Sequence, residues 1–158
     1  TDCLLQQGAK RVYAIDVGYG QLAYSLRCDP RVVVIERQNI RFLPEGTIPE
    51  KADLVTIDVS FVSLEKIIPG LLPLLAETGE IVALVKPQFE VGKGEVGAGG
   101  IVRYAKQHQA VLTRIKQKAA LWGEGPQGLT MVGSVPSSLK GKKGNQEFFI
   151  YLKKGLKQ

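Results

Sequence analysis

Short runs of valine and isoleucine recur along this chain and place the tightest limit on its fold. Their apolar residues occupy consecutive positions over a few residues, which is typical of strands buried on both faces of a sheet. The runs predict strands at residues 11–16, 31–36, 52–59 and 80–86, with two final strands at 128–136 and 145–154.

The segments between these runs place leucine and isoleucine at helical spacing. They predict helices at 20–29 and 61–77 and a long polar helix at 103–123. Pro69 and Pro73 should kink or shorten the second helix, because proline lacks an amide hydrogen and clashes with the preceding turn. Strands alternating with helices favour an α/β fold with a largely parallel sheet and right-handed crossovers. No helix separates the last two strands, so we expect an antiparallel pair joined by residues 137–144.

The composition fits one domain of 158 residues that is 44% hydrophobic. No apolar run approaches the ~20 residues of a membrane span, and no signal peptide is recognisable, so a cytoplasmic protein is expected. The net charge of +6 suits a phosphate-rich partner. Cys3 and Cys28 are far apart and lack histidine or cysteine neighbours, so we expect two buried thiols, no disulfide and no metal site.

Charged residues end the strand-like runs where ligands bind in α/β sheets, at the carboxyl edge. Asp16, Glu36, Asp58 and Lys86 end the first four runs, and Glu147 lies near the start of the last, oppositely directed strand. We therefore expect Asp58, Lys86 and Glu147 to converge. Three plainer interpretations remain: Asp58 caps a helix, Lys86 extends its amine to water, and Glu147 faces solvent.

A glycine motif gives a competing hypothesis. Residues 18–23 fit the G-x-G-x-x-A pattern of dinucleotide-binding folds, with Glu36 at the distance of a ribose ligand. Asp16 directly precedes these glycines, where its carboxylate would repel a pyrophosphate but could accept hydrogen bonds from ribose hydroxyls. Residues 92–100 lack the Lys-Ser/Thr pair of a P-loop and predict a mobile loop over the site. His108 is expected in water, which sets aside histidine-based nucleophilic catalysis.

Longer segments carry a resemblance across nearly the whole chain. They are VYAIDVGYGQLAYSLRCDPRVVVIERQNIR (12–41), DLVTIDVSFVSL (53–64), ALVKPQFE (83–90) followed by EVGAGGIVR (95–103), and GNQEFFIYL (144–152). In this order they resemble the hemolysin-like TlyA family of ribosomal RNA 2′-O-ribose methyltransferases, whose catalytic domain is FtsJ-like.

The resemblance implies a Rossmann-like class I methyltransferase sheet, mostly parallel with an antiparallel C-terminal strand. It also implies S-adenosylmethionine as methyl donor and ribosomal RNA within a subunit as substrate. FtsJ-like enzymes use a Lys-Asp-Lys-Glu tetrad, and its last three members fall on Asp58, Lys86 and Glu147. Lys86 would act as a base or orient the reacting oxygen. Donor contacts are expected from Asp16, Val17, Glu36, Arg37, Asn39 and Asp58.

The chain departs from the family pattern at its start. A full-length member carries an S4-like RNA-binding domain, the first catalytic lysine and a first strand ending in a glycine-rich donor loop. This chain begins where that loop would finish, so we expect one partial FtsJ-like domain whose strands at 11–16 and 53–59 lack their shared neighbour. A non-catalytic RNA-binding fragment, using Lys140, Lys142 and Lys143, is an alternative. A membrane-active hemolysin has no amphipathic or spanning segment to support it.

Overall fold

A computed structural model describes residues 1–92, 94–122 and 128–155. The chain divides into two compact units, Thr1–Pro49 and Glu50–Gln158. No helix within the described ranges is long and apolar enough to cross a membrane. Within the same ranges, no group of three or more histidine, cysteine or acidic side chains is arranged to hold a metal ion.

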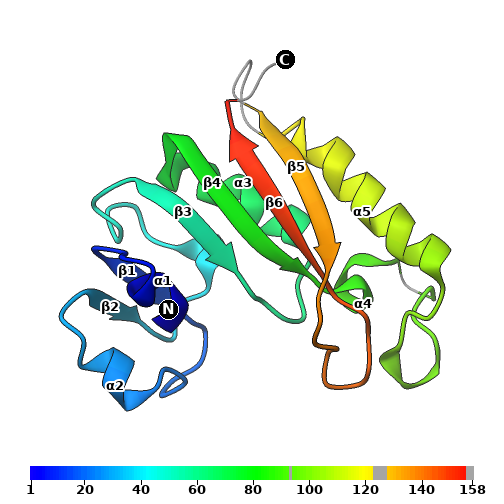
Figure 1. Ribbon diagram of the computed structural model, residues 1–158, viewed down its shortest axis with the longest axis horizontal. Helices are drawn as coiled ribbons and strands as arrows, with labels where there is room; N and C mark the ends of the chain where they lie inside the picture. The colour runs from blue at the N-terminus through cyan, green and yellow to red at the C-terminus, as the bar shows by residue number, and fades with distance from the viewer. Residues whose placement is uncertain (93, 123–127, 156–158) are drawn as a thin grey trace. The chain divides into compact units, whose positions relative to one another are not determined.

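The first unit is built on a two-stranded parallel sheet (Figure 1). Its strands pair in register from Val12↔Val32 to Ile15↔Ile35, so both carboxyl ends reach the same edge. The elements are α1 (Asp2–Gln6), β1 (Val12–Ile15), α2 (Tyr24–Arg27), β2 (Val32–Ile35) and the 3-10 helix η1 (Ile40–Phe42).

Two predictions for the first unit were wrong. The helix expected at 20–29 is reduced to the four residues of α2. It begins only at Tyr24, because the backbone of Ala23 is extended (ψ 142°), and beyond its end Asp29 closes a turn with the Arg31 amide. Cys3 and Cys28 are exposed instead of buried, since both lie on short surface helices or their ends.

The second unit contains a four-stranded sheet in the order β3-β4-β6-β5. β3 runs parallel to β4, and β6 runs antiparallel to both β4 and β5, which confirms the predicted final pair. The strands are β3 (Ala52–Ile57), β4 (Leu75–Val85), β5 (Leu129–Pro136) and β6 (Phe148–Lys154).

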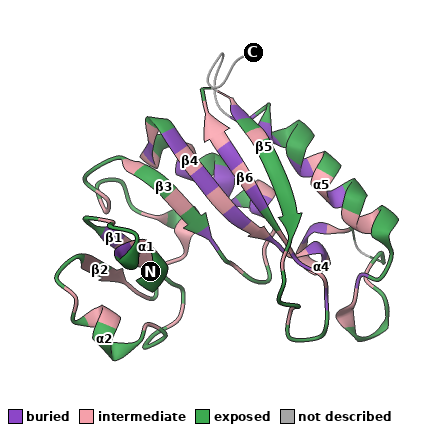
Figure 2. Cartoon of the chain, in the orientation of Figure 1, coloured by how far each residue is buried: buried purple, intermediate pink, exposed green. Residues whose placement is uncertain are grey.

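The core of the second unit lies on one face of this sheet. Ile81, Ala83 and Val85 alternate with less buried residues along β4, which gives the stripes of Figure 2. Figure 1 shows α3 behind the sheet and α5 beside β5, and Val111 and Ile115 of α5 are buried. The helical segments are η2 (Leu64–Lys66), α3 (Ile68–Leu71), η3 (Leu72–Leu74), α4 (Pro87–Glu90), η4 (Ala98–Gly100) and α5 (Ala105–Ala119).

Two further predictions, the helix at 61–77 and the burial of both strand faces, differ from the structure. The helix expected at 61–77 is broken into η2, α3 and η3, with Pro69 and Pro73 in the first turns of the last two, as the two prolines suggested. Burial on both strand faces was wrong: Leu54 of β3 and Val33 of β2 are each 38% exposed. β3 is an edge strand of its sheet, and β4 is packed fully on one face only. The predicted helix at 103–123 is confirmed as α5, although its expected last residue lies outside the described residues.

Candidate functional site

Asp58 and Lys86 form an ion pair at the carboxyl edge of the second unit's sheet. They follow β3 and β4, which are neighbouring parallel strands, so both side chains emerge at the same edge. The Lys86 Nζ lies 2.7 Å from Asp58 Oδ1 and donates a hydrogen bond of 3.0 Å to Ser60 Oγ. The Lys86 side chain is 13% exposed and that of Asp58 69%. Within the described residues, these contacts leave one of the three ammonium N–H bonds for a further acceptor.

Glu147 lies beside this pair on the neighbouring strand. The last registered pair of β4 and β6 is Val85↔Phe148, so Lys86 and Glu147 are the next position on each strand. Glu147 is 8% exposed, which overturns the interpretation that it faces solvent. Its Oε1 accepts a hydrogen bond of 3.2 Å from Gln88 Nε2. The structure thus brings the three predicted residues to one edge, with α4 as the link.

Gln88 is a residue that sequence reasoning missed. Its amide nitrogen is committed to Glu147, while its Oε1 is buried without a hydrogen-bond partner in the described structure. An unpaired buried acceptor is costly and uncommon. This oxygen is therefore an acceptor that a donor from a bound substrate would satisfy.

The loop before Glu147 is fastened to a second loop by Asn145. Asn145 is 2% exposed; its Oδ1 accepts from the Val102 amide and its Nδ2 donates to the Gly100 carbonyl, both at 2.9 Å. Gly141 packs against the Glu147 carboxylate so closely that a Cβ there would lie 2.5 Å from Oε1. The position of Glu147 is thus fixed by a glycine on one side and by Gln88 on the other.

Glu90, the last residue of α4, ties that helix to the segment around η2. It is 6% exposed, and its carboxylate accepts hydrogen bonds from the Leu64 amide at 2.8 Å and the Ser63 hydroxyl at 2.7 Å. Arg114 reaches both the Glu90 carbonyl and, at 3.8 Å, its carboxylate. Burial raises the pKa of Glu90 above its ordinary value, and the hydrogen bonds and Arg114 oppose that shift. No local sequence signal marks Glu90, because its partners come from distant segments.

The segment after Asp58 carries an exposed aromatic residue. Phe61 is 90% exposed and has a left-handed φ of 63°, a conformation that bulky residues rarely adopt. Its ring centroid lies 5.0 Å from that of Phe89 in α4. The turn and α4 therefore contact each other next to Lys86.

Two carboxylates end β1 and β2 in the first unit. Asp16 Oδ1 accepts a hydrogen bond of 2.6 Å from the Gly18 amide. Glu36 Oε1 accepts one of 2.9 Å from the Gly20 amide and pairs with Arg27. The Arg27 guanidinium lowers the pKa of Glu36, with a smaller contribution from the Gly20 amide. Glu36 is therefore ionised at neutral pH and acts only as an acceptor.

The loops after β1 and β2 are hydrogen-bonded to each other. The Arg37 amide donates to the Gly18 carbonyl at 3.1 Å, and the Gln38 amide to the Asp16 carbonyl at 3.0 Å. The Arg37 guanidinium lies 4.5 Å from the centroid of the Tyr19 ring. Two backbone bonds and a cation–π contact thus hold both loops at one edge.

This edge fits the nucleoside portion of S-adenosylmethionine. Ribose hydroxyls are donors, and carboxylates at strand ends are acceptors suited to them. Val17 is 68% exposed and offers an apolar surface beside Asp16. Asn39 uses its Oδ1 for the Arg41 amide, which leaves its side-chain NH₂ as a donor.

The structure also places the remaining predicted positions. Lys140, Lys142 and Lys143 are exposed in the loop before Glu147. His108 is only half-exposed: its Nε2 lies 2.9 Å from the Val102 carbonyl, and its ring packs edge-on to Phe148. The expectation of a solvated histidine was wrong, because α5 turns that side chain toward the sheet. One residue of the predicted loop at 92–100, residue 93, lies outside the described residues.

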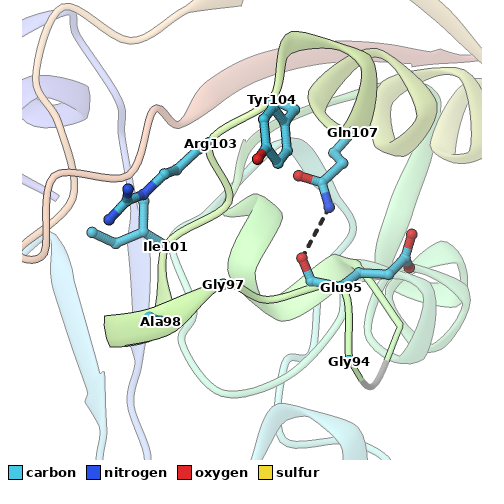
Figure 3. A pocket seen from close by; sticks show the side chains of 8 residues that line it. All are labelled: Gly94, Glu95, Gly97, Ala98, Ile101, Arg103, Tyr104 and Gln107. Atoms are coloured by element: carbon cyan, nitrogen blue, oxygen red, sulfur yellow. Dashed lines mark hydrogen bonds between the residues drawn. The ribbon is translucent and has the colours of Figure 1, made fainter.

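A pocket of about 470 Å³ opens between this loop and the start of α5 (Figure 3). Tyr104 and Gln107 lie on one side, and the glycine-rich backbone forms another. The Gln107 Nε2 donates to the Glu95 carbonyl at 2.9 Å. The lining residues are Gly94, Glu95, Gly97, Ala98, Ile101, Arg103, Tyr104 and Gln107.

Comparison with known proteins gives consistent matches. The FtsJ-like methyltransferase family matches residues 1–154. The chain is 46% identical over 153 residues to the 16S/23S rRNA (cytidine-2′-O)-methyltransferase TlyA of Mycobacterium tuberculosis, covering 97% of this chain and 55% of that protein. The chain thus spans about half the length of the curated relatives it matches.

Solved structures agree with the sequence matches. A hemolysin-named protein from Streptococcus thermophilus superimposes with a TM-score of 0.89 at 42% identity, over 97% of this chain and 54% of that one. The O-methyltransferase TomG of Streptomyces achromogenes, solved with SAM, gives a TM-score of 0.56 at 16% identity over 92% and 62% of the two chains. The second likeness concerns the fold alone and supports the predicted Rossmann-like sheet. Because the family match covers residues 1–154, almost the whole chain, the chain belongs to the FtsJ-like methyltransferase family.

Proposed function

We propose that this chain is part of an S-adenosylmethionine-dependent methyltransferase that modifies ribose 2′-hydroxyls of ribosomal RNA. The observation that carries the proposal is the cluster of Asp58, Lys86 and Glu147 at one sheet edge, in a member of this family. The name of the Mycobacterium tuberculosis relative supports ribosomal RNA as substrate. The exposed lysines beside Glu147 and the net charge of +6 suit a polyanion.

The donor supplies a methyl group on a sulfonium, and the residues of this chain hold the reacting groups. Asp16 and Glu36 accept hydrogen bonds from the donor's ribose, while Val17, Arg37 and Asn39 flank its adenine. These roles match the acceptor and apolar groups at the β1–β2 edge.

Lys86 holds the substrate hydroxyl. Its free N–H bond points a donor at the 2′-oxygen, while Asp58 and Ser60 fix the direction of the amine. Such positioning of a nucleophile can supply a large share of a rate enhancement. As the new C–O bond would form and the donor's C–S bond break, the hydroxyl proton would leave to water, because an ammonium that already carries three N–H bonds cannot accept it. Glu147 would hold the substrate ribose beside Lys86.

The experiment uses the native protein that carries this chain, a radiolabelled methyl donor and ribosomal RNA lacking the modification. Wild-type protein should label the RNA at a ribose, which is recognised because a 2′-O-methyl group blocks alkaline cleavage of the adjacent phosphodiester. Lys86→Ala should lower kcat by about 10²-fold, the loss expected when the reacting oxygen is no longer held in position. The matched control is Lys10→Ala, an exposed lysine away from these residues in the chain.

Two results would overturn the proposal. One is labelled RNA whose modified nucleotide remains sensitive to alkali, which would place the methyl group on a base. The other is RNA binding by the wild-type protein without any methyl transfer, which would favour a non-catalytic RNA-binding role.

A further inference from the structure

The pocket at the start of α5 is large enough for a small ligand. Its volume of about 470 Å³ lies within the range of pockets that hold small ligands. Gly94, Gly97 and Ala98 contribute little side-chain bulk, so backbone groups reach the opening. None of the residues given catalytic or donor-binding roles above lines this pocket.

Tyr104 gives the pocket a stacking surface. Tyr104 is 72% exposed and lines the opening of the pocket. Stacking of a nucleobase on such a ring contributes about 1 to 3 kcal/mol to binding, whichever base it is. An exposed tyrosine is therefore a suitable contact for an unpaired base.

Positive charge gathers at the same opening. Arg103 is exposed and forms no ion pair among the described residues. It lies two residues before α5, a helix of 15 residues that has no side-chain cap and no acid in its first turn. The Glu95 carboxylate accepts the Gly92 amide at 2.7 Å, and its side chain points away from Arg103 in Figure 3. The arginine side of the pocket thus suits a phosphate.

Asn145 attaches the pocket to the catalytic edge. Its side chain binds the Gly100 carbonyl and the Val102 amide, the two neighbours of the pocket residue Ile101. Asn145 itself precedes Glu147 by two residues. Asn145 therefore links the wall of the pocket at Ile101 to the segment that carries Glu147.

We propose that this pocket binds one unpaired nucleotide of the RNA substrate close to the methylated ribose, with its base on Tyr104 and its phosphate at Arg103. The proposal rests on the function proposed above, because it assigns the ligand from an RNA substrate. A free nucleotide would present the same base and phosphate, so the experiment must separate the two sources.

The first measurement is RNA affinity, which does not depend on methyl transfer. The native protein carrying this chain is titrated against a fluorescein-labelled single-stranded decauridylate and followed by fluorescence anisotropy. Tyr104→Ala should weaken binding about 5- to 100-fold, the range that corresponds to the loss of one stacked base. Tyr104→Phe should restore binding, because the ring provides the contact. Tyr24→Ala, which removes another exposed tyrosine, is the matched control and should change nothing.

The second measurement separates this inference from the proposed function. In methyl transfer to ribosomal RNA, Tyr104→Ala should raise KM by a similar factor and leave kcat within about twofold. Arg103→Gln should reduce the salt dependence of binding by about 0.7 in log–log slope, as expected for one lost phosphate contact to a single strand. Failure of methyl transfer by wild type would sink the proposed function, while the affinity loss in Tyr104→Ala would still support an RNA contact.

Three results would overturn the inference. Unchanged affinity in Tyr104→Ala would show that no base stacks there, and failure of Tyr104→Phe to restore affinity would point to a structural role. Equal affinity for uridine monophosphate and for the decauridylate, with both lost in Tyr104→Ala, would make the pocket a mononucleotide site.

Discussion

The β1–β2 edge of the first unit and the β4–β6 edge of the second differ in how their polar groups are held. At the first, Val17 is 68% exposed, and the loops are joined mainly through backbone hydrogen bonds. At the second, Asn145 and Glu147 are 2% and 8% exposed, and their side chains are held by groups from distant segments. Water can replace a lost contact at an exposed edge, whereas a buried group left unpaired costs its full desolvation. Substitutions should thus affect ligand affinity at the first edge, and geometry or stability at the second.

The largest expected effect tests this division directly. Asp16→Ala in the native protein should weaken donor binding by about 10- to 100-fold, the cost of losing a hydrogen bond to a charged acceptor. Lys86→Ala should leave the donor's Kd within about twofold, because Lys86 serves the substrate hydroxyl. Calorimetric titration of S-adenosylmethionine measures both, with thermal melting to confirm folding. Equal losses in the two variants would contradict separate roles.

A smaller effect is expected from Gly141, at the buried edge. Gly141→Ala should lower kcat about tenfold, because the added Cβ displaces the Glu147 carboxylate and small misplacements of reacting groups are costly. The RNA affinity should persist. Gly133→Ala is the control, since a Cβ on this β5 glycine has no atom within 4 Å. If the Gly141→Ala enzyme kept the wild-type kcat, the position of the Glu147 carboxylate would not matter for catalysis.

Glu36 of the first unit and Glu90 of the second should respond oppositely to acid. The folded pKa of Glu36 is lowered, so its contribution to stability is present above its ordinary pKa of 4.5 and is lost as the pH falls through the folded value. The folded pKa of Glu90 is raised, so its contribution is greatest below 4.5 and is lost as the pH rises through the folded value.

Urea unfolding of wild type, Glu36→Gln and Glu90→Gln from pH 4 to pH 7 measures this contrast. The stability of wild type relative to Glu36→Gln should rise with pH, and its stability relative to Glu90→Gln should fall. Parallel curves for the two variants would mean that burial does not raise the pKa of Glu90.

The smallest effect concerns the exposed thiols. Cys3 and Cys28 should both react with a chromogenic disulfide reagent in the folded protein, within about tenfold of their rates in urea, because folding leaves them accessible. Cys3→Ser and Cys28→Ser should each lower the chromophore released without unfolding by one equivalent. A single fast thiol would show that one of them is covered in solution.

The parts of the site that were predictable follow from strand direction. Asp58 and Lys86 end neighbouring parallel strands, and Glu147 begins an antiparallel one, so their edge could be predicted from the order of the apolar runs. The short helices could not be predicted with the same success. Leucine spacing at 61–77 indicated one helix, but two prolines and the early start of β4 at Leu75 divided the segment.

The supporting residues were not predictable from local pattern. Gln88, Asn145 and Glu90 meet partners 59, 43 and 26 residues away in the chain. Such contacts depend on tertiary packing, which neither periodicity nor spacing specifies. A buried glutamate such as Glu90 would even be predicted to face solvent, because charged residues are rarely buried without a partner.

Asn145 occupies a position at which few substitutions should be tolerated. Its amide meets one donor and one acceptor at once, at Val102 and Gly100. Aspartate would set an acceptor against a carbonyl, serine and threonine are too short to span both groups, and lysine offers no acceptor. Glutamine keeps the chemistry but adds a methylene in a position that is 2% exposed. A random change at this codon is therefore expected to be removed by selection far more often than one at the exposed lysines nearby.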